Sequence, residues 1–275
     1  MITLEEALTT GRGTERPINC PNPDHPDDHA SASLNVVKGV WFCYGCHTKG
    51  TVAGHIPDPK MALRLLAESD EEPRVYPWSW LDFFDAAHPS PYWAARFGED
   101  TASTFRCGTD PVSGEPTYPL IDSIGDVLGV VRRSEGQPKY RYPYRARTST
   151  CLFMSPWASG FPDVLVLLEG AADVMSLYSA GLPIGWRAAG CYGAGLHRPQ
   201  MGLVAGMMPR LIVLAFDSDE AGKRAIEQAW EPCSAIAPTV SVAWSNFDVK
   251  DPAELPPQQR IQALHQAIDT VRSTA

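Results

Sequence analysis

The sequence predicts an α/β protein of more than one domain, in which a parallel β-sheet carries helices on both faces. Two observations support this prediction. Apolar strand-like runs alternate with helix-like segments in the second half of the chain, and three cysteines crowd into its first fifty residues. The 275 residues also exceed the usual size of one domain. We therefore expect a small metal-binding region, a mixed α+β region with a basic stretch, and a larger α/β region.

The charge of the chain is unevenly distributed. The formal net charge is −9, which as a mean argues against a phosphate-rich partner. Residues 132–147 nevertheless hold six basic side chains and one acidic one. The hydrophobic content of 44% and the charged content of 20% exclude a disordered, fibrous or coiled-coil chain. Because no apolar run is long enough for a bilayer and the first residues lack a secretory pattern, we expect a cytoplasmic protein with no membrane partner.

The first element is a predicted zinc site. Its pattern is C-x4-H-x17-C-x2-C, and zinc favours four tetrahedral sulfur and nitrogen donors. Four protein ligands leave no open position, which favours a structural zinc over a catalytic one. His29 and His47 are alternatives to the predicted histidine. The predicted ligands are Cys20, His25, Cys43 and Cys46.

Two short strands are predicted between these ligand pairs. Residues 33–37 and 40–43 are typical of two short strands, and Lys38-Gly39 supplies a tight turn. A hairpin that carries the second ligand pair is a zinc ribbon. We place this domain at residues 1–56 and expect a linker over residues 57–77.

The larger region contains two copies of one pattern, which is an apolar strand, an acidic residue and a helix. In the first copy, residues 163–168 precede Glu169 and a helix from residue 171. In the second, residues 211–216 precede Asp217-Ser218-Asp219 and a helix from residue 220. Further strands are expected within residues 183–190 and 239–244, and a final helix runs from Gln258 to about Arg272.

Acidic side chains should converge at one edge of this sheet. Glu169, Asp217 and Asp219 follow strands whose carboxyl ends share that edge, and we expect Asp251 to join them. Asp173 lies one helical turn after Glu169. Because gathered carboxylates repel one another, they require cations, and oxygen ligands suit Mg²⁺ or Mn²⁺. Taken singly, Asp173 and Asp219 are equally well explained as helix caps.

These motifs resemble those of bacterial and phage DnaG-type DNA primases, in which a Cys-His-Cys-Cys zinc ribbon precedes an RNA polymerase core with a Toprim fold. In the ribbon, the resemblance rests on Cys20-Pro21 and on residues 31–36 and 41–46. The family usually has two residues between the first cysteine and the histidine, whereas this sequence has four.

In the core, the resemblance rests on three acidic motifs and on the segments before them. The acidic motifs are residues 169–173, 217–222 and 251–254, and the earlier segments are residues 118–122, 125–132, 138–140 and 152–153. The implied domains are a basic part of the polymerase core at 78–160, a Toprim domain at 161–255 and a C-terminal helix at 256–275. The residues expected to face the template and the nucleotide phosphates are Arg132, Lys139, Tyr140 and Arg141.

The resemblance implies a DNA primase, which synthesises short RNA primers on single-stranded DNA by two-metal nucleotidyl transfer. The setting would be phage, plasmid or bacterial DNA replication. The implied cofactors are one structural zinc ion and two Mg²⁺ or Mn²⁺ ions, held by Glu169, Asp173, Asp217, Asp219 and Asp251. Glu169 could instead act as a general base.

The implied partners are single-stranded DNA and nucleoside triphosphates, with a replicative helicase or a second primase polypeptide as further candidates. Two alternatives stay open. A Toprim nuclease would use the same acids for strand cleavage, and a zinc-ribbon DNA-binding protein would need no catalysis. Formation of RNA, cleavage of the template, or neither would separate the three.

Overall fold

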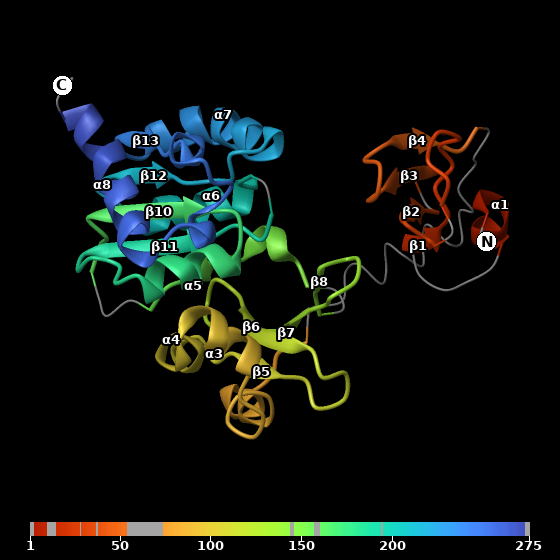
Figure 1. Cartoon of the computed structure of the whole chain (residues 1–275), viewed down its shortest axis with the longest axis horizontal. Coiled ribbons are helices and arrows are strands. Elements are labelled where there is room, and N and C mark those ends of the chain that lie inside the picture. Colours follow the sequence, from red (N-terminus) through yellow and green to blue (C-terminus); the bar gives the residue numbers. More distant parts are fainter. Residues whose placement is uncertain are drawn as a thin grey trace. The chain divides into compact units, whose positions relative to one another are not determined.

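The protein is described by a computed structural model that falls into two compact units, one formed by residues 1–72 with 135–139 and the other by residues 73–134 with 140–275 (Figure 1). The expected linker lies mainly outside the described residues, as do Val37 and Arg145. Within the described part, no helix is long and apolar enough to cross a membrane. The structure describes residues 3–9, 15–27, 29–36, 38–53, 74–143, 146–156, 160–193 and 195–272.

The described residues of the first unit form a four-stranded antiparallel sheet and one short helix. The strands follow one another in the order β1-β2-β3-β4, and the expected hairpin corresponds to β2 and β3. The flanking strands β1 and β4 were not expected. Ile18, Leu34 and Cys43 are fully buried and form its small core with their neighbours. The elements are α1 (Leu4–Thr9), β1 (Glu15–Ile18), β2 (Ala32–Asn35), β3 (Val40–Cys43) and β4 (Lys49–Thr51).

The second unit begins with a smaller antiparallel sheet in the order β5-β6-β7-β8. Tyr118 and Leu120 of β6 are buried, so this sheet has an apolar face. Ser90 caps α3 by accepting a hydrogen bond from Trp93 N, and Pro91 occupies the first helical position. The elements are η1 (Trp78–Phe83), α3 (Pro91–Phe97), α4 (Glu99–Thr104), β5 (Gly108–Thr109), β6 (Pro116–Ile121), β7 (Val127–Arg133), β8 (Tyr140–Arg141) and η2 (Thr148–Thr150).

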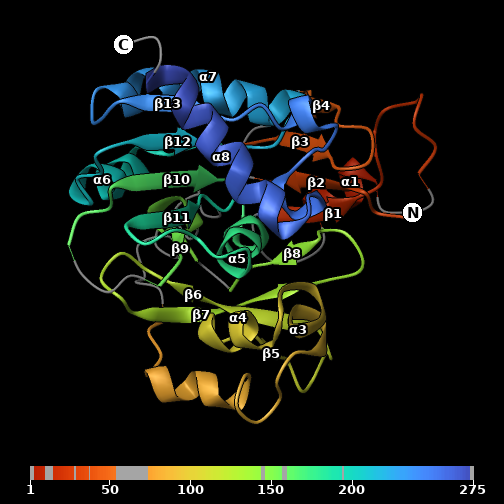
Figure 2. The ribbon, with the colours of Figure 1, turned by 60° about the vertical axis from the view of Figure 1, so that its left-hand side comes forward.

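The main sheet of the second unit has five strands in the order β13-β12-β10-β11-β9 (Figure 2). The four strands β13, β12, β10 and β11 are parallel, and β9 pairs with β11 in the antiparallel direction. This arrangement confirms the α/β prediction. The strands are β9 (Phe153–Met154), β10 (Val164–Leu168), β11 (Trp186–Gly190), β12 (Ile212–Leu214) and β13 (Thr239–Ser241).

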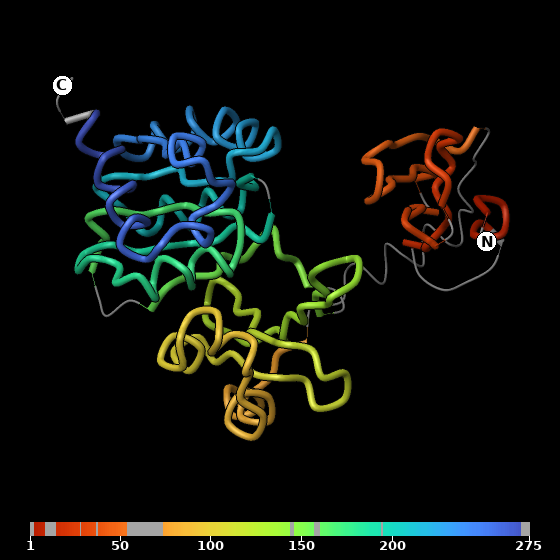
Figure 3. Tube along the Cα trace, in the orientation of Figure 1, coloured from red at the N-terminus to blue at the C-terminus, as the bar shows by residue number. Residues whose placement is uncertain are grey.

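Helices cover both faces of this sheet because its central strand is apolar on both sides. Val164, Val166 and Leu168 pack with α5 and α8, whereas Leu165 and Leu167 pack with α6 and α7. Figure 3 follows the chain through the two strand–turn–helix repeats. The remaining elements are α5 (Ala171–Ser179), α6 (Arg198–Gly206), α7 (Glu220–Ser234), η3 (Trp244–Phe247), η4 (Pro252–Glu254) and α8 (Pro257–Arg272).

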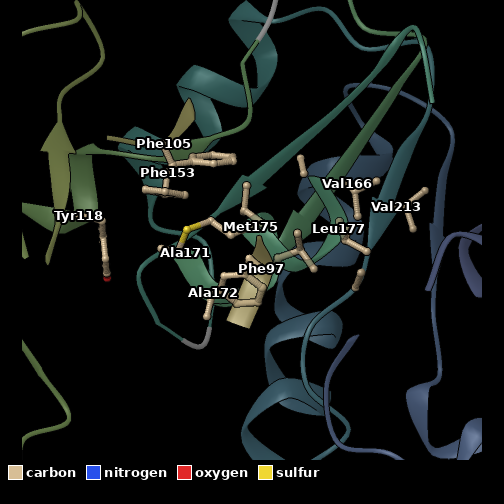
Figure 4. Close-up of a cluster of buried hydrophobic side chains, with 14 of the residues drawn as sticks. Phe97, Phe105, Tyr118, Phe153, Val166, Ala171, Ala172, Met175, Leu177 and Val213 are labelled. Carbon is tan, nitrogen blue, oxygen red and sulfur yellow. The ribbon is translucent and has the colours of Figure 1, made fainter. Parts of the chain in front are cut away.

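The two sheets of the second unit share one apolar core (Figure 4). The rings of Phe105 and Phe153 stack with centroids 5.2 Å apart, and Tyr118 meets Phe153 edge-on at 5.3 Å. Met175 of α5 belongs to the same cluster. Segments on both sides of residue 160, where we predict a domain boundary, therefore contribute to the same core.

Candidate active site and metal centre

The five predicted acids lie at or near the carboxyl ends of the parallel strands. Glu169 directly follows β10, and Asp217 follows β12, its neighbour in the sheet. Asp173 is in the first turn of α5, Asp219 is the N-cap of α7, and Asp251 is the N-cap of η4. Each has an electrostatic influence on at least one of the others. The fold thus brings together side chains that are up to 82 positions apart in the sequence.

Asp173 and Asp219, for which capping was the alternative interpretation, do cap helices, and Asp251 also caps η4. Asp173 accepts a hydrogen bond from Gly170 N at 3.0 Å. Asp219 accepts from Ala221 N at 3.0 Å and Gly222 N at 2.9 Å. A Cβ atom at Gly222 would stand only 2.0 Å from the Asp217 carbonyl oxygen, so α7 can begin here only with glycine at this position. Capping therefore orients these carboxylates at the rim and does not remove them from it.

Burial and mutual repulsion disfavour the ionised form of three of the acids. The pKa of Glu169 is raised to about 7, first by burial and then by the charges of Asp217 and Asp219. Burial, followed by the charge of Asp217, raises the pKa of Asp173 to about 8. The pKa of Asp217 is also raised by burial, whereas the hydrogen bond from Gly222 lowers that of Asp219. Nearby positive charge would therefore be needed to keep all of these carboxylates ionised.

One residue that the sequence analysis did not single out supplies part of this charge. Lys250 Nζ lies 3.2 Å from Asp217 Oδ2 and 3.1 Å from Asp219 Oδ2. The signal for it was its place directly before Asp251 in the third acidic motif. The oxygen donors of this rim fit Mg²⁺, which uses one or two carboxylates and completes its shell with water and phosphate oxygens.

The predicted zinc ligands form a much tighter group. Within the part of the chain that the structure describes, they are the one set of three or more histidine, cysteine or acidic side chains whose ligand atoms all lie within 4.8 Å of one another. Cys20 Sγ and Cys46 Sγ are 3.6 Å apart, and His25 Nδ1 is 3.7 Å from Cys43 Sγ. His29 and His47, the alternatives, are not in the set. Three sulfurs and one nitrogen fit tetrahedral zinc.

Local contacts explain how four residues can separate the first cysteine from the histidine. The Asp27 carboxylate accepts hydrogen bonds from Cys20 N at 2.6 Å and from Ser31 Oγ at 2.8 Å, which draws this loop together. The His25 ring packs against Gly45, where a Cβ atom would come within 2.8 Å of the ring. The longer loop is therefore compatible with a four-ligand site.

The ribbon thiols differ in their readiness to ionise. Thr48 Oγ1 lies 2.8 Å from Cys46 Sγ, and this contact lowers the pKa of Cys46 to about 6. Burial raises the pKa of Cys20 to about 11. Since zinc binds thiolates, its binding would release protons, chiefly from the less acidic thiols.

Comparisons with known proteins agree with this geometry. A family described as Toprim-like matches residues 166–255, the segment that carries all five acids. The second half of this chain contains a Toprim-like domain. A curated relative, the DNA primase of Borreliella burgdorferi, is 23% identical over 160 residues, which cover 55% of this chain and 30% of that protein. The matched segment is thus less than a third of the relative's length.

A solved structure of a DnaG primase shares the fold of the second unit. The DnaG primase catalytic domain bound to single-stranded DNA matches with a TM-score of 0.52 and 16% identity, over 69% of this chain and 76% of that chain. The zinc-binding and RNA polymerase domains of Aquifex aeolicus primase match with a TM-score of 0.49 and 18% identity, over 95% of this chain and 80% of that chain. The chain resembles DnaG-type DNA primases.

The predicted template-binding residues next to the Toprim-like domain are partly engaged within the protein. Arg132 forms an ion pair with Asp110, and Arg141 forms one with Glu115. Lys139 is exposed and belongs to the first compact unit. The structure therefore does not bring the four predicted residues together in one unit.

Two tyrosines that follow the predicted template-binding arginine Arg132 lie close enough to the acids of the Toprim-like domain for the acids to shift their pKa values. The half-buried Tyr140 meets Tyr118 edge-on at 6.2 Å, and its pKa is raised to about 12 by burial and then by the charge of Asp173. Tyr142, which the sequence analysis did not select, is 39% exposed, and its pKa is raised by burial and by Glu169. Tyr142 is thus the more accessible ring beside the acidic rim.

Two arginines were also missed. Arg133 lies over the Tyr92 ring at 4.7 Å and influences Tyr140. Arg260 of α8 is buried and donates to the main-chain oxygens of Ser176 at 2.8 Å and Leu255 at 2.8 Å. It thereby joins α5, which carries Asp173, to the end of η4, which follows Asp251. The sequence pattern of α8 gives no sign of this contact.

Proposed function

We propose that the protein is a DNA primase, a nucleotidyltransferase that synthesises short RNA on single-stranded DNA. One observation carries the proposal, namely the rim of five acids at the carboxyl end of a Toprim-like sheet with the DnaG catalytic fold. The Cys-His-Cys-Cys site in the same chain adds support. Phage, plasmid or bacterial replication is the proposed setting.

In the proposed reaction, the 3′ oxygen of one ribonucleotide attacks the α-phosphorus of a triphosphate. A bond forms between these atoms, the bond to the β-phosphate oxygen breaks, and pyrophosphate leaves. Two divalent cations bound by the acids would stabilise charge on the attacking and leaving oxygens. Glu169, whose pKa is about 7, is the acid best suited to accept the hydroxyl proton if it is not a ligand.

We assign recognition of the template and the nucleotide to basic and aromatic side chains within residues 132–142. Lys139, Arg132 and Arg141 would contact phosphates, the two arginines only after exchanging their present acidic partners. Tyr142 replaces Tyr140 as our candidate for stacking on a base, because its ring is more accessible. A single zinc ion would stabilise the ribbon, and a replicative helicase or a second primase polypeptide is the candidate protein partner.

The experiment combines the purified protein with single-stranded DNA, all four ribonucleoside triphosphates and Mg²⁺. Short RNA should appear, and the Asp217→Ala/Asp219→Ala variant should reduce its rate by about two to three orders of magnitude or more, given the usual effect of removing groups that stabilise transition-state charge. Glu231→Ala, which removes an exposed acid elsewhere on α7, is the matched control and should retain activity.

The products distinguish the alternatives. Template cleavage without RNA would favour a Toprim nuclease. DNA binding with neither product would favour a zinc-ribbon DNA-binding protein and would contradict the proposal.

A further inference from the structure

Lys250 occupies the place between two carboxylates where a divalent cation would be expected. Its ammonium is 3.2 Å from Asp217 Oδ2 and 3.1 Å from Asp219 Oδ2. Asp217 is nearly buried, with 12% of its side chain exposed, whereas 53% of the Lys250 side chain is exposed. Within the described residues, the ion pairs of the five rim acids come from this lysine alone.

The main chain of Lys250 is firmly attached to the site. Ser218 N donates to the Lys250 carbonyl at 2.8 Å, which joins this residue to the loop between the two acids. Lys250 N donates to Glu254 Oε2 at 2.7 Å. These bonds fix the start of the side chain, while its half-exposed methylene chain can swing towards solvent. The ammonium can therefore leave the carboxylates without any rearrangement of the backbone.

An ammonium and a divalent cation cannot both bind closely to the same two carboxylates. At about 4 Å, two unit charges repel by about 4 kcal/mol at the effective dielectric constant typical of a protein surface, and a divalent ion doubles this. The oxygens that Lys250 contacts belong to the two acids proposed to bind metal. Metal binding must therefore displace the ammonium or make use of other oxygens.

We propose that Lys250 is the resident counter-cation of Asp217 and Asp219 and that it competes with the divalent cation for them. The lysine stabilises the acidic rim before metal arrives and raises the metal concentration that the rim requires. A metal ion that arrives with a triphosphate overcomes this competition more readily, because the displaced ammonium can then pair with phosphate oxygens. The inference deepens the proposed function, on which its nucleotide part rests.

The test is a titration with Mn²⁺ alone, without DNA or nucleotide, on the zinc-loaded full chain, with free Mn²⁺ measured by electron paramagnetic resonance. Lys250→Met should bind Mn²⁺ about two- to fivefold more tightly than the unaltered protein, since a partly exposed ion pair contributes up to about this factor. The Mn²⁺ affinity of Lys250→Arg should stay close to that of the unaltered protein. Lys223→Met is the matched control, because Lys223 is an exposed lysine of α7 paired with Glu220. It should change the affinity by less than about twofold.

A second readout is independent of affinity. Without Mn²⁺, Lys250→Met should melt at a lower temperature than the unaltered protein. Added Mn²⁺ should raise the melting temperature of Lys250→Met by more than that of the unaltered protein. If Lys250→Met does not fold, Lys250→Gln is tested in the same way. Equal or weaker Mn²⁺ binding by the folded variant, relative to Lys223→Met, would overturn the inference.

Failure of this inference can be told apart from failure of the proposed function. If the unaltered protein makes RNA but Lys250→Met binds Mn²⁺ no more tightly, only the role of Lys250 is wrong. If Lys250→Met binds Mn²⁺ more tightly but no preparation makes RNA, the competition stands and the primase proposal fails.

Discussion

The ribbon and the acidic rim are both suited to metal ions, but they are organised in opposite ways. In the ribbon, four ligand atoms lie within 4.8 Å of one another. At the rim, the carboxylates share a lysine, and the pKa of Glu169 is raised to about 7, chiefly by burial. The ribbon ligands carry less negative charge before a metal binds than a cluster of ionised carboxylates, whose members repel one another. From this comparison we propose that a metal ion in the ribbon would be structural and that metal ions at the rim would exchange with solvent.

The largest expected effect comes from Cys43→Ala in the ribbon. The variant should lose its zinc, from about one ion per chain to none detectable, and the ribbon should unfold, because metal binding in such small domains supplies about 10 kcal/mol or more. Elemental analysis and limited proteolysis measure the two effects. Cys107→Ala, which changes a buried cysteine of the second unit, should keep the zinc. A ribbon that stays folded without zinc would contradict the structural role.

The next effect tests whether the rim is held by the protein itself and not by metal. Arg260→Met removes the hydrogen bonds from the guanidinium to the main-chain oxygens of Ser176, Leu255 and Ala253, so these oxygens lose a charged donor. We expect a loss of about 2–3 kcal/mol, or a melting temperature about 5–10 °C lower, with unchanged zinc content. Calorimetry measures the change. Arg224→Met, an exposed change on α7, serves as the control, and an equal effect of the two variants would count against the proposed role of Arg260.

Because burial and neighbouring carboxylates raise the pKa of Glu169, we expect the stability of the protein to depend on pH. The pKa of Glu169 is about 7 in the folded protein, above its ordinary value of 4.5. Between these pH values the folded state keeps a proton that the unfolded state has released, so stability falls as pH rises through this range. Over this pH range, the free energy of unfolding of Glu169→Gln should decrease by about 1–2 kcal/mol less than that of the unaltered protein, after allowance for partial solvent exposure.

The measurement is the melting temperature of the two proteins from pH 5 to pH 8 without divalent cations. Saturating Mg²⁺ should flatten the profile of the unaltered protein. Parallel profiles for the unaltered protein and Glu169→Gln would show that this carboxylate does not carry the effect.

The smallest effect tests the packing around the ribbon histidine. In Gly45→Ala, the added methyl group would approach His25 Cε1 to within 2.8 Å. The ring must shift, and zinc affinity should fall about tenfold, as for other residues that orient metal ligands. Competition with a chromophoric chelator measures this, with Lys38→Ala as an exposed ribbon control. Unchanged affinity would mean that His25 is not held as the structure indicates.

The strands that the sequence predicts are those with clear apolar patterns. Residues 164–168 and 212–214 form continuous apolar strands, and both occur where we expected them. The short strands at Glu15–Ile18 and Lys49–Thr51 carry no such pattern, since one contains a proline and the other is Lys-Gly-Thr. They form because the hairpin between them offers two free edges.

The acids of the site were predictable because each follows a strand or begins a helix, which are local features. Lys250 stands directly before Asp251 in the sequence, but its contacts with Asp217 and Asp219, like the nearness of Tyr142 to Glu169, depend on how distant segments pack. The same holds for Arg132 and Arg141, whose acidic partners are 22 and 26 positions away in the sequence. Sequence spacing identified the type of chemistry, and tertiary contacts decide which side chains are free to take part.

The most direct test of the account is RNA synthesis by protein that holds one zinc per chain, assayed with and without added Mg²⁺ after mild chelation. We predict that chelation stops synthesis, that zinc content stays near one ion per chain, and that Mg²⁺ alone restores synthesis. Synthesis without any added divalent cation, or none with saturating Mg²⁺ and zinc in place, would contradict the account.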